Sequence, residues 1–120
     1  MIYSIIYSQR AIETYDAITE QIDNRWGSKY VDDFERRTIK VIESIQVSPF
    51  IFQAIEAKPN LRKGFIHRNC SLFYEVEETQ IFILFFWTTG RSQFFYNEEK
   101  ALHRYRNNKL RIHTLHTVNH

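Results

Sequence analysis

The sequence predicts an α+β domain in which a small antiparallel sheet is covered on one face by a hairpin of two helices. Residues 61–96 contain consecutive apolar stretches joined by short polar turns, as expected for an antiparallel meander. Two amphipathic stretches precede them and are separated by little more than Gly27. An apolar stretch opens the chain, so the expected order is strand, helix, helix, strand, strand, strand. The 120 residues are enough for one core.

The composition indicates a folded protein with aromatic surface left over for a partner. Apolar residues make up 43% of the chain and aromatic residues 16%, which excludes a disordered chain. The ten Phe, seven Tyr and two Trp exceed what a small core hides, so we expect some at a binding surface. The single cysteine, Cys70, fits a reducing cytoplasm. The first residues do not form a signal peptide, so a cytoplasmic location without membrane contact is expected.

The net charge of +2 is unevenly distributed along the chain. Residues 100–120 carry +5 with no acidic residue, which leaves −3 on residues 1–99. A basic tail on a mildly acidic body indicates a polyanionic target such as nucleic acid, or an acidic partner. The alternative is a solvated terminus without a role in binding.

The first predicted elements are a strand and a helix. The apolar run 2–7 reads as a strand, and Ser8 is suited to cap the helix that follows. Gly27 is a typical helix end. Between them, apolar residues recur at intervals of three and four and form one helical stripe, namely Ala11, Tyr15, Ile18, Ile22 and Trp26.

A second helix of nearly equal length is predicted from Ser28 to the Ser48-Pro49 pair, which ends it. Because the connection is so short, the two helices must form an antiparallel hairpin. The apolar face of this helix consists of Val31, Phe34, Thr38, Val41, Ile42 and Ile45. Residues 50–60 follow as a loop whose apolar side chains are expected to fold back onto the core.

The remaining strands are predicted at residues 61–68, 70–76 and 81–87. The last of them is apolar without interruption and far too short to span a bilayer, so we expect it to be buried on both faces, with Phe85 and Trp87 in the core. Residues 1–96 form the main body of the domain. Residues 97–120 are expected to add a basic C-terminal tail that begins with a short helix over 97–106, capped by Asn97.

A polar turn, Thr88-Thr89-Gly90-Arg91-Ser92, ends the most apolar strand and makes Arg91 the first candidate functional residue. Functional residues are concentrated on loops held by a rigid scaffold. A guanidinium in this position can bind phosphate bidentately or pair with a partner's carboxylate.

Several segments of the predicted helices and strands stand out by their order and spacing more than by any single motif. They are Ala11-Ile12-Glu13, Ile22 and Arg25-Trp26-Gly27 in the first helix, then Leu61-Arg62-Lys63, Ser71-Leu72-Phe73-Tyr74-Glu75-Val76 and Ile81-Phe82-Ile83-Leu84 in the strands. Together, over about residues 1–96, they resemble the RelE/ParE superfamily of bacterial type II toxins.

This resemblance implies a toxin that a cognate antitoxin protein keeps silent. Members of the superfamily differ in their target: ParE-like toxins inhibit DNA gyrase, whereas RelE-like toxins cleave mRNA on the ribosome without a metal. The long hairpin with Arg25-Trp26-Gly27 favours ParE-like action. The alternatives are RelE-like endoribonuclease activity, which alone would make the protein an enzyme, and a non-toxic module that only docks its antitoxin.

The resemblance also implies candidate residues for an RNA-cleavage site. Arg91 matches the arginine after the last strand in RelE-like enzymes, and Tyr96 stands near their C-terminal tyrosine. Arg62 and Lys63 lie on the strand that carries basic residues there. The arginine expected in the next strand is replaced by Ser71, which weakens the match to a complete cleavage site.

His67 and Arg68 are the candidates to replace that missing chemistry, since histidine titrates near neutrality. The alternative for Arg62, Lys63 and Arg68 is that they are ordinary charges of a strand face and a turn. No metal is expected, because the histidines lack cysteine or carboxylate neighbours at ligand spacing. No cofactor is expected either, since the chain has no phosphate-binding glycine loop.

Overall fold

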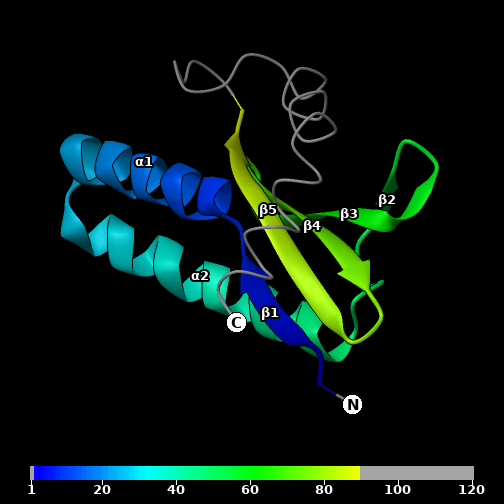
Figure 1. Ribbon diagram of the computed structural model, residues 1–120. Coiled ribbons are helices and arrows are strands. Elements are labelled where there is room, and N and C mark those ends of the chain that lie inside the picture. The colour runs from blue at the N-terminus through cyan, green and yellow to red at the C-terminus, as the bar shows by residue number, and fades with distance from the viewer. Residues whose placement is uncertain (1, 90–120) are drawn as a thin grey trace.

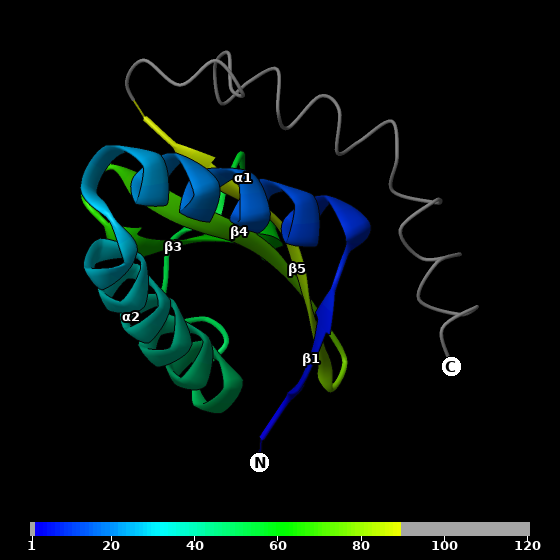
Figure 2. The ribbon, with the colours of Figure 1, turned by 90° about the vertical axis from the view of Figure 1, so that its left-hand side faces the viewer.

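The computed structural model describes residues 2–89, and these confirm the predicted α+β class (Figure 1). Both helices lie on the same side of a five-stranded sheet (Figures 1 and 2). The elements in chain order are β1 (Ser4–Tyr7), α1 (Gln9–Trp26), α2 (Ser28–Val47), β2 (Ala54–Ile55), β3 (Lys58–His67), β4 (Cys70–Glu77) and β5 (Gln80–Thr88).

The strand order in the sheet is β1-β5-β4-β3-β2. The pairs β2–β3, β3–β4 and β4–β5 are antiparallel, as the short turns predict. β1 instead runs parallel to β5, with Ile5 opposite Ile81. The helical hairpin makes this possible, because a parallel pair needs a long crossover connection.

α1 begins where the sequence predicts and extends the edge of the sheet. The Ser8 hydroxyl oxygen accepts a hydrogen bond from the backbone N–H of Ala11 (2.9 Å) and donates one to the carbonyl of Leu84 (2.7 Å). Farther along α1, the Thr14 hydroxyl accepts a hydrogen bond from the backbone N–H of Phe86 (2.9 Å). α1 therefore satisfies the edge of β5 beyond the point where β1 ends.

The predicted stripe on α1 is confirmed for all but its last residue. Ala11 and Ile18 are buried, while Tyr15 and Ile22 pack against the core from partly buried positions. Trp26 is 57% exposed and lies outside the core. It is the final residue of α1, where the chain turns into α2, so the helix no longer faces the sheet there.

One glycine connects the two helices. Gly27 adopts φ +95°, a backbone conformation that L side chains rarely adopt, and ends α1 while opening α2. The apolar face of α2 is confirmed, since Phe34, Thr38 and Ile45 are buried. The Tyr15 ring stacks on Phe34 (5.6 Å between centroids) and joins the two helices.

The loop predicted over residues 50–60 contains a short strand. β2 pairs with β3, which itself begins at Lys58 and not at Leu61. The turn between them places Glu56 and Ala57 at φ 52° and 58°. Hairpin turns with positive φ at both central residues usually use Asn-Gly or Asp-Gly, which explains why this one was not predicted.

β4 and β5 form the centre of the core, and Phe85 and Trp87 are buried as predicted. Tyr74 is also fully buried, and its hydroxyl donates a 2.7 Å hydrogen bond to the carbonyl of Pro49. Burial raises the pKa of Tyr74 to about 12, so the phenol is neutral at physiological pH. This bond anchors the end of α2 to the middle of the sheet.

Thr88, at the end of β5, has a buried hydroxyl without a hydrogen-bond partner among residues 2–89. An unsatisfied buried polar group lowers stability, so Thr88→Val should raise the free energy of unfolding by about 1 kcal/mol. The measurement is chemical denaturation of the full chain. Thr38→Val is the matched control, because its hydroxyl already donates to the carbonyl of Phe34. A stabilisation by Thr38→Val as large as that by Thr88→Val would contradict this explanation.

No helix within residues 2–89 is both long and apolar enough to cross a membrane. The helix predicted over residues 97–106 and the basic tail lie outside the described residues.

Candidate functional site

The face of β3, β4 and β5 that points away from the helices carries a row of aromatic and cationic side chains. Successive side chains of a strand point to opposite faces. Phe86 of β5 contacts Tyr15 of α1 (5.2 Å between ring centroids), so its neighbour Phe85 faces the other way. The register continues this face to Phe73 on β4 and Lys63 on β3.

We call Lys63, Phe73, Phe85 and Arg10 the cation–aromatic row. The Phe73 and Phe85 rings stack with centroids 4.6 Å apart. The Lys63 ammonium lies 5.6 Å from the Phe73 ring centroid, and the Arg10 guanidinium lies 5.8 Å from that of Phe85. Arg10 reaches this face because α1 continues the sheet edge next to β5. The row thus places a cation at each end of an aromatic pair.

The row is buried in its middle and extends to an exposed ring at one end. Phe73 and Phe85 are buried, whereas Phe65, two residues from Lys63 on β3, is 56% exposed. The Lys63 ammonium lies 5.5 Å from the Phe65 ring as well. Glu75 places a carboxylate on the same face, two residues along β4 from Phe73. Since the stacked rings are buried, the groups of this face that can contact an anionic or aromatic partner are the two cations and the exposed Phe65 ring.

The side chain of Arg62, a predicted site residue, is held by hydrogen bonds to nearby backbone carbonyls. Its Nε donates to the carbonyl of Pro59 (2.8 Å) and its Nη1 to that of Phe52 (2.9 Å). The guanidinium also lies 4.9 Å from the Phe50 ring centroid. These contacts close the hairpin of β2 and β3. Arg62 and Lys63 are neighbours in sequence but point to opposite faces of β3.

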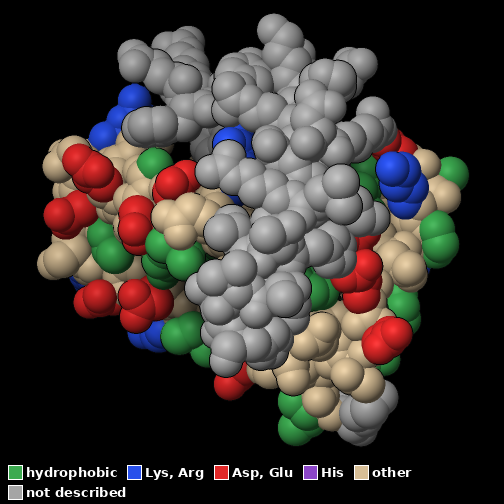
Figure 3. All heavy atoms as spheres, in the orientation of Figure 1, with side chains coloured by type: hydrophobic (Ala, Val, Ile, Leu, Met, Phe, Trp, Pro, Cys, Tyr) green, Lys and Arg blue, Asp and Glu red, His purple; other side chains and the backbone are tan. Residues whose placement is uncertain are grey.

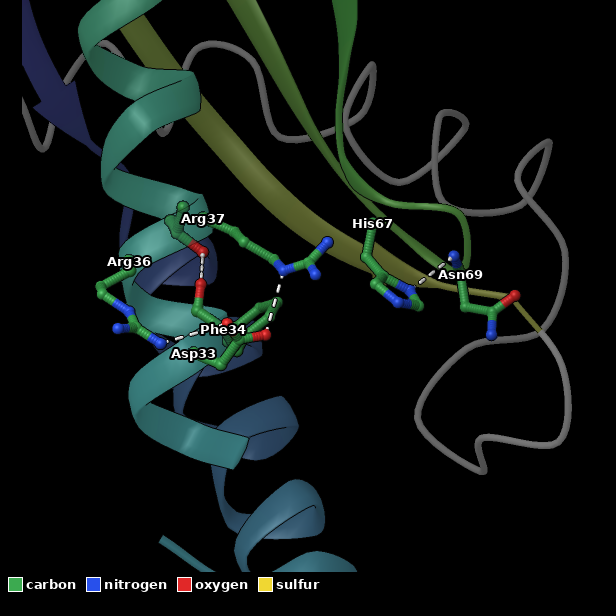
Figure 4. A network of polar contacts seen from close by, with 7 residues as sticks. Asp33, Phe34, Arg36, Arg37, His67 and Asn69 are labelled. Carbon is green, nitrogen blue, oxygen red and sulfur yellow. Dashed lines mark hydrogen bonds and ion pairs between the residues drawn. The ribbon is translucent and has the colours of Figure 1, made fainter. Parts of the chain in front are cut away.

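His67 and Arg68 lie at the turn between β3 and β4, at the end of the sheet near the connection between the helices. Both are exposed. His67 Nδ1 accepts a 3.4 Å hydrogen bond from the backbone N–H of Asn69 (Figure 4). The structure therefore does not bring His67 into the cation–aromatic row. Arg91 and Tyr96 lie outside the described residues.

Residue type alone did not point to Arg10, Phe73 and Phe85. The uninterrupted apolar run 81–87 predicted a core position for Phe85, and no pattern in the sequence indicated a role for Phe73 or Arg10. Their joint position depends on the register between strands and on the course of α1. Ser71, which stands where the resemblance expects an arginine, is buried on the same face as Phe73. Residues 2–89 contain no group of three metal-ligating side chains.

A second candidate surface is an open groove between α1 and α2, with a volume of about 300 Å³, which we call the helix groove. Tyr7, Ile12 and Ile39 line it and are each about half exposed. Its charged lining residues are Asp16 and Glu35. Figure 3 shows acidic side chains gathered over the helices, with apolar ones between them. The helix groove thus suits an apolar segment with basic flanks.

Solved structures identify the fold. A chain of the chromosomal ParDE toxin–antitoxin system from P. aeruginosa matches with a TM-score of 0.62 and 18% identity, over 74% of this chain and 98% of that one. The chain has a RelE/ParE-type toxin fold. The conserved hypothetical protein HP0894 from Helicobacter pylori matches with a TM-score of 0.50 and 15% identity, over 78% of this chain and 100% of its own.

A chain of the E. coli DinJ-YafQ toxin-antitoxin complex is less similar, with a TM-score of 0.49 and 9% identity, over 73% of this chain and 93% of that one. No protein-family profile matches the sequence, and no curated protein is significantly similar to it. The RelE/ParE-type fold confirms the architecture that the sequence resemblance implied.

Proposed function

We propose that the protein is the toxin of a type II toxin–antitoxin pair, and that it blocks growth by a ParE-like inhibition of DNA gyrase. The fold supports the toxin role, since a ParDE chain shares it over most of both lengths. Such a toxin and its target meet in the cytoplasm. The choice of target is supported by the cation–aromatic row.

The row is better suited to binding a macromolecule than to cleaving RNA. Metal-free cleavage needs a base, an acid and a cation that converge on one phosphate. The middle of the row is filled by the Phe73 and Phe85 rings, and its cations stand apart at the two ends. Arg62, which the RelE-like scheme would use, is committed to backbone carbonyls. The two buried rings instead hold a partly exposed cation at each end of the row, where a macromolecule can contact it.

The antitoxin is proposed to cover the helix groove while the toxin is silent. Exposed Ile12 and Ile39 on facing helices give an amphipathic segment an apolar groove to enter. Antitoxin binding at the helices is compatible with a target-binding surface on the opposite face of the sheet. The antitoxin would then silence the toxin in one of two ways. It could extend around the edge of the sheet onto the target-binding face, or it could hold the toxin away from its target.

The proposal is tested by two assays on the full chain. Purified protein should inhibit gyrase-catalysed supercoiling of relaxed plasmid, and induced expression should stop thymidine incorporation before leucine incorporation. Leucine incorporation that stops first, with mRNA cut on ribosomes, would establish the RelE-like alternative. Normal growth despite soluble expression would establish a non-toxic docking module. In the RelE-like case, Glu75→Gln would show whether that carboxylate takes part in cleavage.

A further inference from the structure

A pocket of about 290 Å³ lies where the ends of α1 and α2 meet the turn between β3 and β4. Its floor is apolar, because Ile18, Phe34 and Cys70 are buried there. Burial raises the pKa of the Cys70 thiol to about 12, so the sulfur is uncharged and acts as part of the apolar floor. We call it the hairpin-end pocket.

The mouth of this pocket carries positive charge that residues 2–89 do not neutralise. Arg25 and His67 line it from α1 and from the β3–β4 turn, and Arg37 lines it from α2. Asp33 is the acidic residue in the lining, and it is shared between Arg37 (3.0 Å) and Arg36 (3.2 Å). Within the described residues Arg25 forms no ion pair and instead lies 5.6 Å from the Trp26 ring centroid. The cations at the mouth can therefore bind a carboxylate of another molecule.

Two basic groups face each other across the mouth. Arg37 bonds Asp33 through Nε, and the end of its guanidinium extends from α2 toward His67 (Figure 4). His67 uses Nδ1 to accept from the Asn69 backbone, so in the neutral ring Nε2 carries the proton and can donate. A carboxylate between them would receive hydrogen bonds from two elements of the fold.

Exposed aromatic rings extend the apolar floor outward. Trp26 and Tyr30 line the pocket and are 57% and 55% exposed, with ring centroids 6.3 Å apart. Large exposed rings beside a pocket are typical of protein-binding sites. The volume is at the small end of the range for ligand pockets, which begins at roughly 300 Å³. It fits one or two side chains and is small for a complete nucleotide.

We propose that the hairpin-end pocket binds an acidic segment of a partner protein, with a large apolar side chain on the floor and flanking carboxylates on Arg25, Arg37 and His67. Charge decides the nature of this partner, because the mouth is basic whereas the helix groove is lined by acidic residues. The inference goes beyond the proposed function, since such a segment can bind whether or not the protein inhibits growth.

The test uses a panel of ten-residue peptides with blocked ends, each with a central leucine, isoleucine or phenylalanine and two glutamates on either side. Binding to the full chain is measured by calorimetry and by protection of Trp26 from acrylamide quenching. We expect saturable binding by at least one of these peptides below about 1 mM. Replacing the glutamates with lysine, or the central residue with alanine, should weaken it about tenfold or more.

Protein variants locate the site. Arg25→Gln/Arg37→Gln should weaken binding about tenfold, since two charge-assisted contacts are lost. Arg36→Gln is the matched control, because Arg36 shares the Asp33 ion pair but does not line the pocket, and its binding should stay within about twofold of the wild type. Thermal melts check that each variant is folded, and the peptide substitutions test the pocket on the unmodified protein.

Three results would overturn the proposal: no peptide of the panel saturating below about 1 mM, equal losses from the double variant and from Arg36→Gln, or no protection of Trp26. Displacement of the peptides by hexauridylate, regardless of the central residue, would assign the mouth to nucleic acid instead.

Discussion

Phe85→Ala should lower the free energy of unfolding by about 3–5 kcal/mol, which is a large share of the stability of a domain of this size. Phe85 is 1% exposed, stacks on Phe73 and lies in the central part of β5. Removing its ring leaves a cavity and also ends the contact with the Arg10 guanidinium. The measurement is urea denaturation of the purified full chain, followed by tryptophan fluorescence and circular dichroism.

Phe65→Ala provides the comparison, since Phe65 belongs to the same face of the sheet but is mostly exposed. Its loss should change the free energy of unfolding by less than about 1 kcal/mol. Similar losses for Phe65→Ala and Phe85→Ala would mean that the rings of this face contribute equally, and the arrangement of the row would then be wrong.

Removing both cations of the row should abolish growth inhibition without unfolding the protein. In Lys63→Gln/Arg10→Gln the stacked rings remain, but the positive charge at their ends is lost. Truncating a charged group that a partner contacts often costs about 2 kcal/mol or more, so the loss of two such groups should lower affinity for the target by about 1,000-fold. Growth after induced expression without antitoxin, together with gyrase inhibition in vitro, measures the effect.

Lys58→Gln is the control for this double variant, because Lys58 lies on the same strand, is exposed and takes no part in the row. It should remain toxic. A double variant that is well folded and still fully toxic would remove the row from the target-binding surface. Attention would then move to the predicted residues Arg91 and Tyr96.

The local parts of the fold were predictable because local chemistry determines them. Ser8 is a capping residue directly before an apolar stripe, and it caps α1 as expected. Gly27 ends that helix because its φ of +95° suits glycine. The uninterrupted apolar run of β5 predicted burial on both faces, which holds for Phe85 and Phe86 alike.

Features that depend on distant contacts were not predictable in this way. β2 was missed because its turn uses Glu56 and Ala57 in a conformation that favours glycine and asparagine. The helical periodicity assigned Trp26 to the core, since periodicity does not show where a helix passes the edge of the sheet. The cation–aromatic row could not be predicted either, because Lys63, Phe73 and Phe85 become neighbours only through the strand register.

The parallel pairing of β1 with β5 has a consequence for how the protein is made. Its registered partners, such as Tyr7 and Ile83, and the Ser8–Leu84 hydrogen bond, which spans 76 positions, join the two ends of the described chain. Contacts of such high sequence separation slow folding, because loop closure must precede their stabilising effect. During synthesis β1 cannot pair within the sheet until β5 has left the ribosome. For a protein proposed to be toxic, this delay would keep the nascent chain harmless until nearly all of the described domain has been translated.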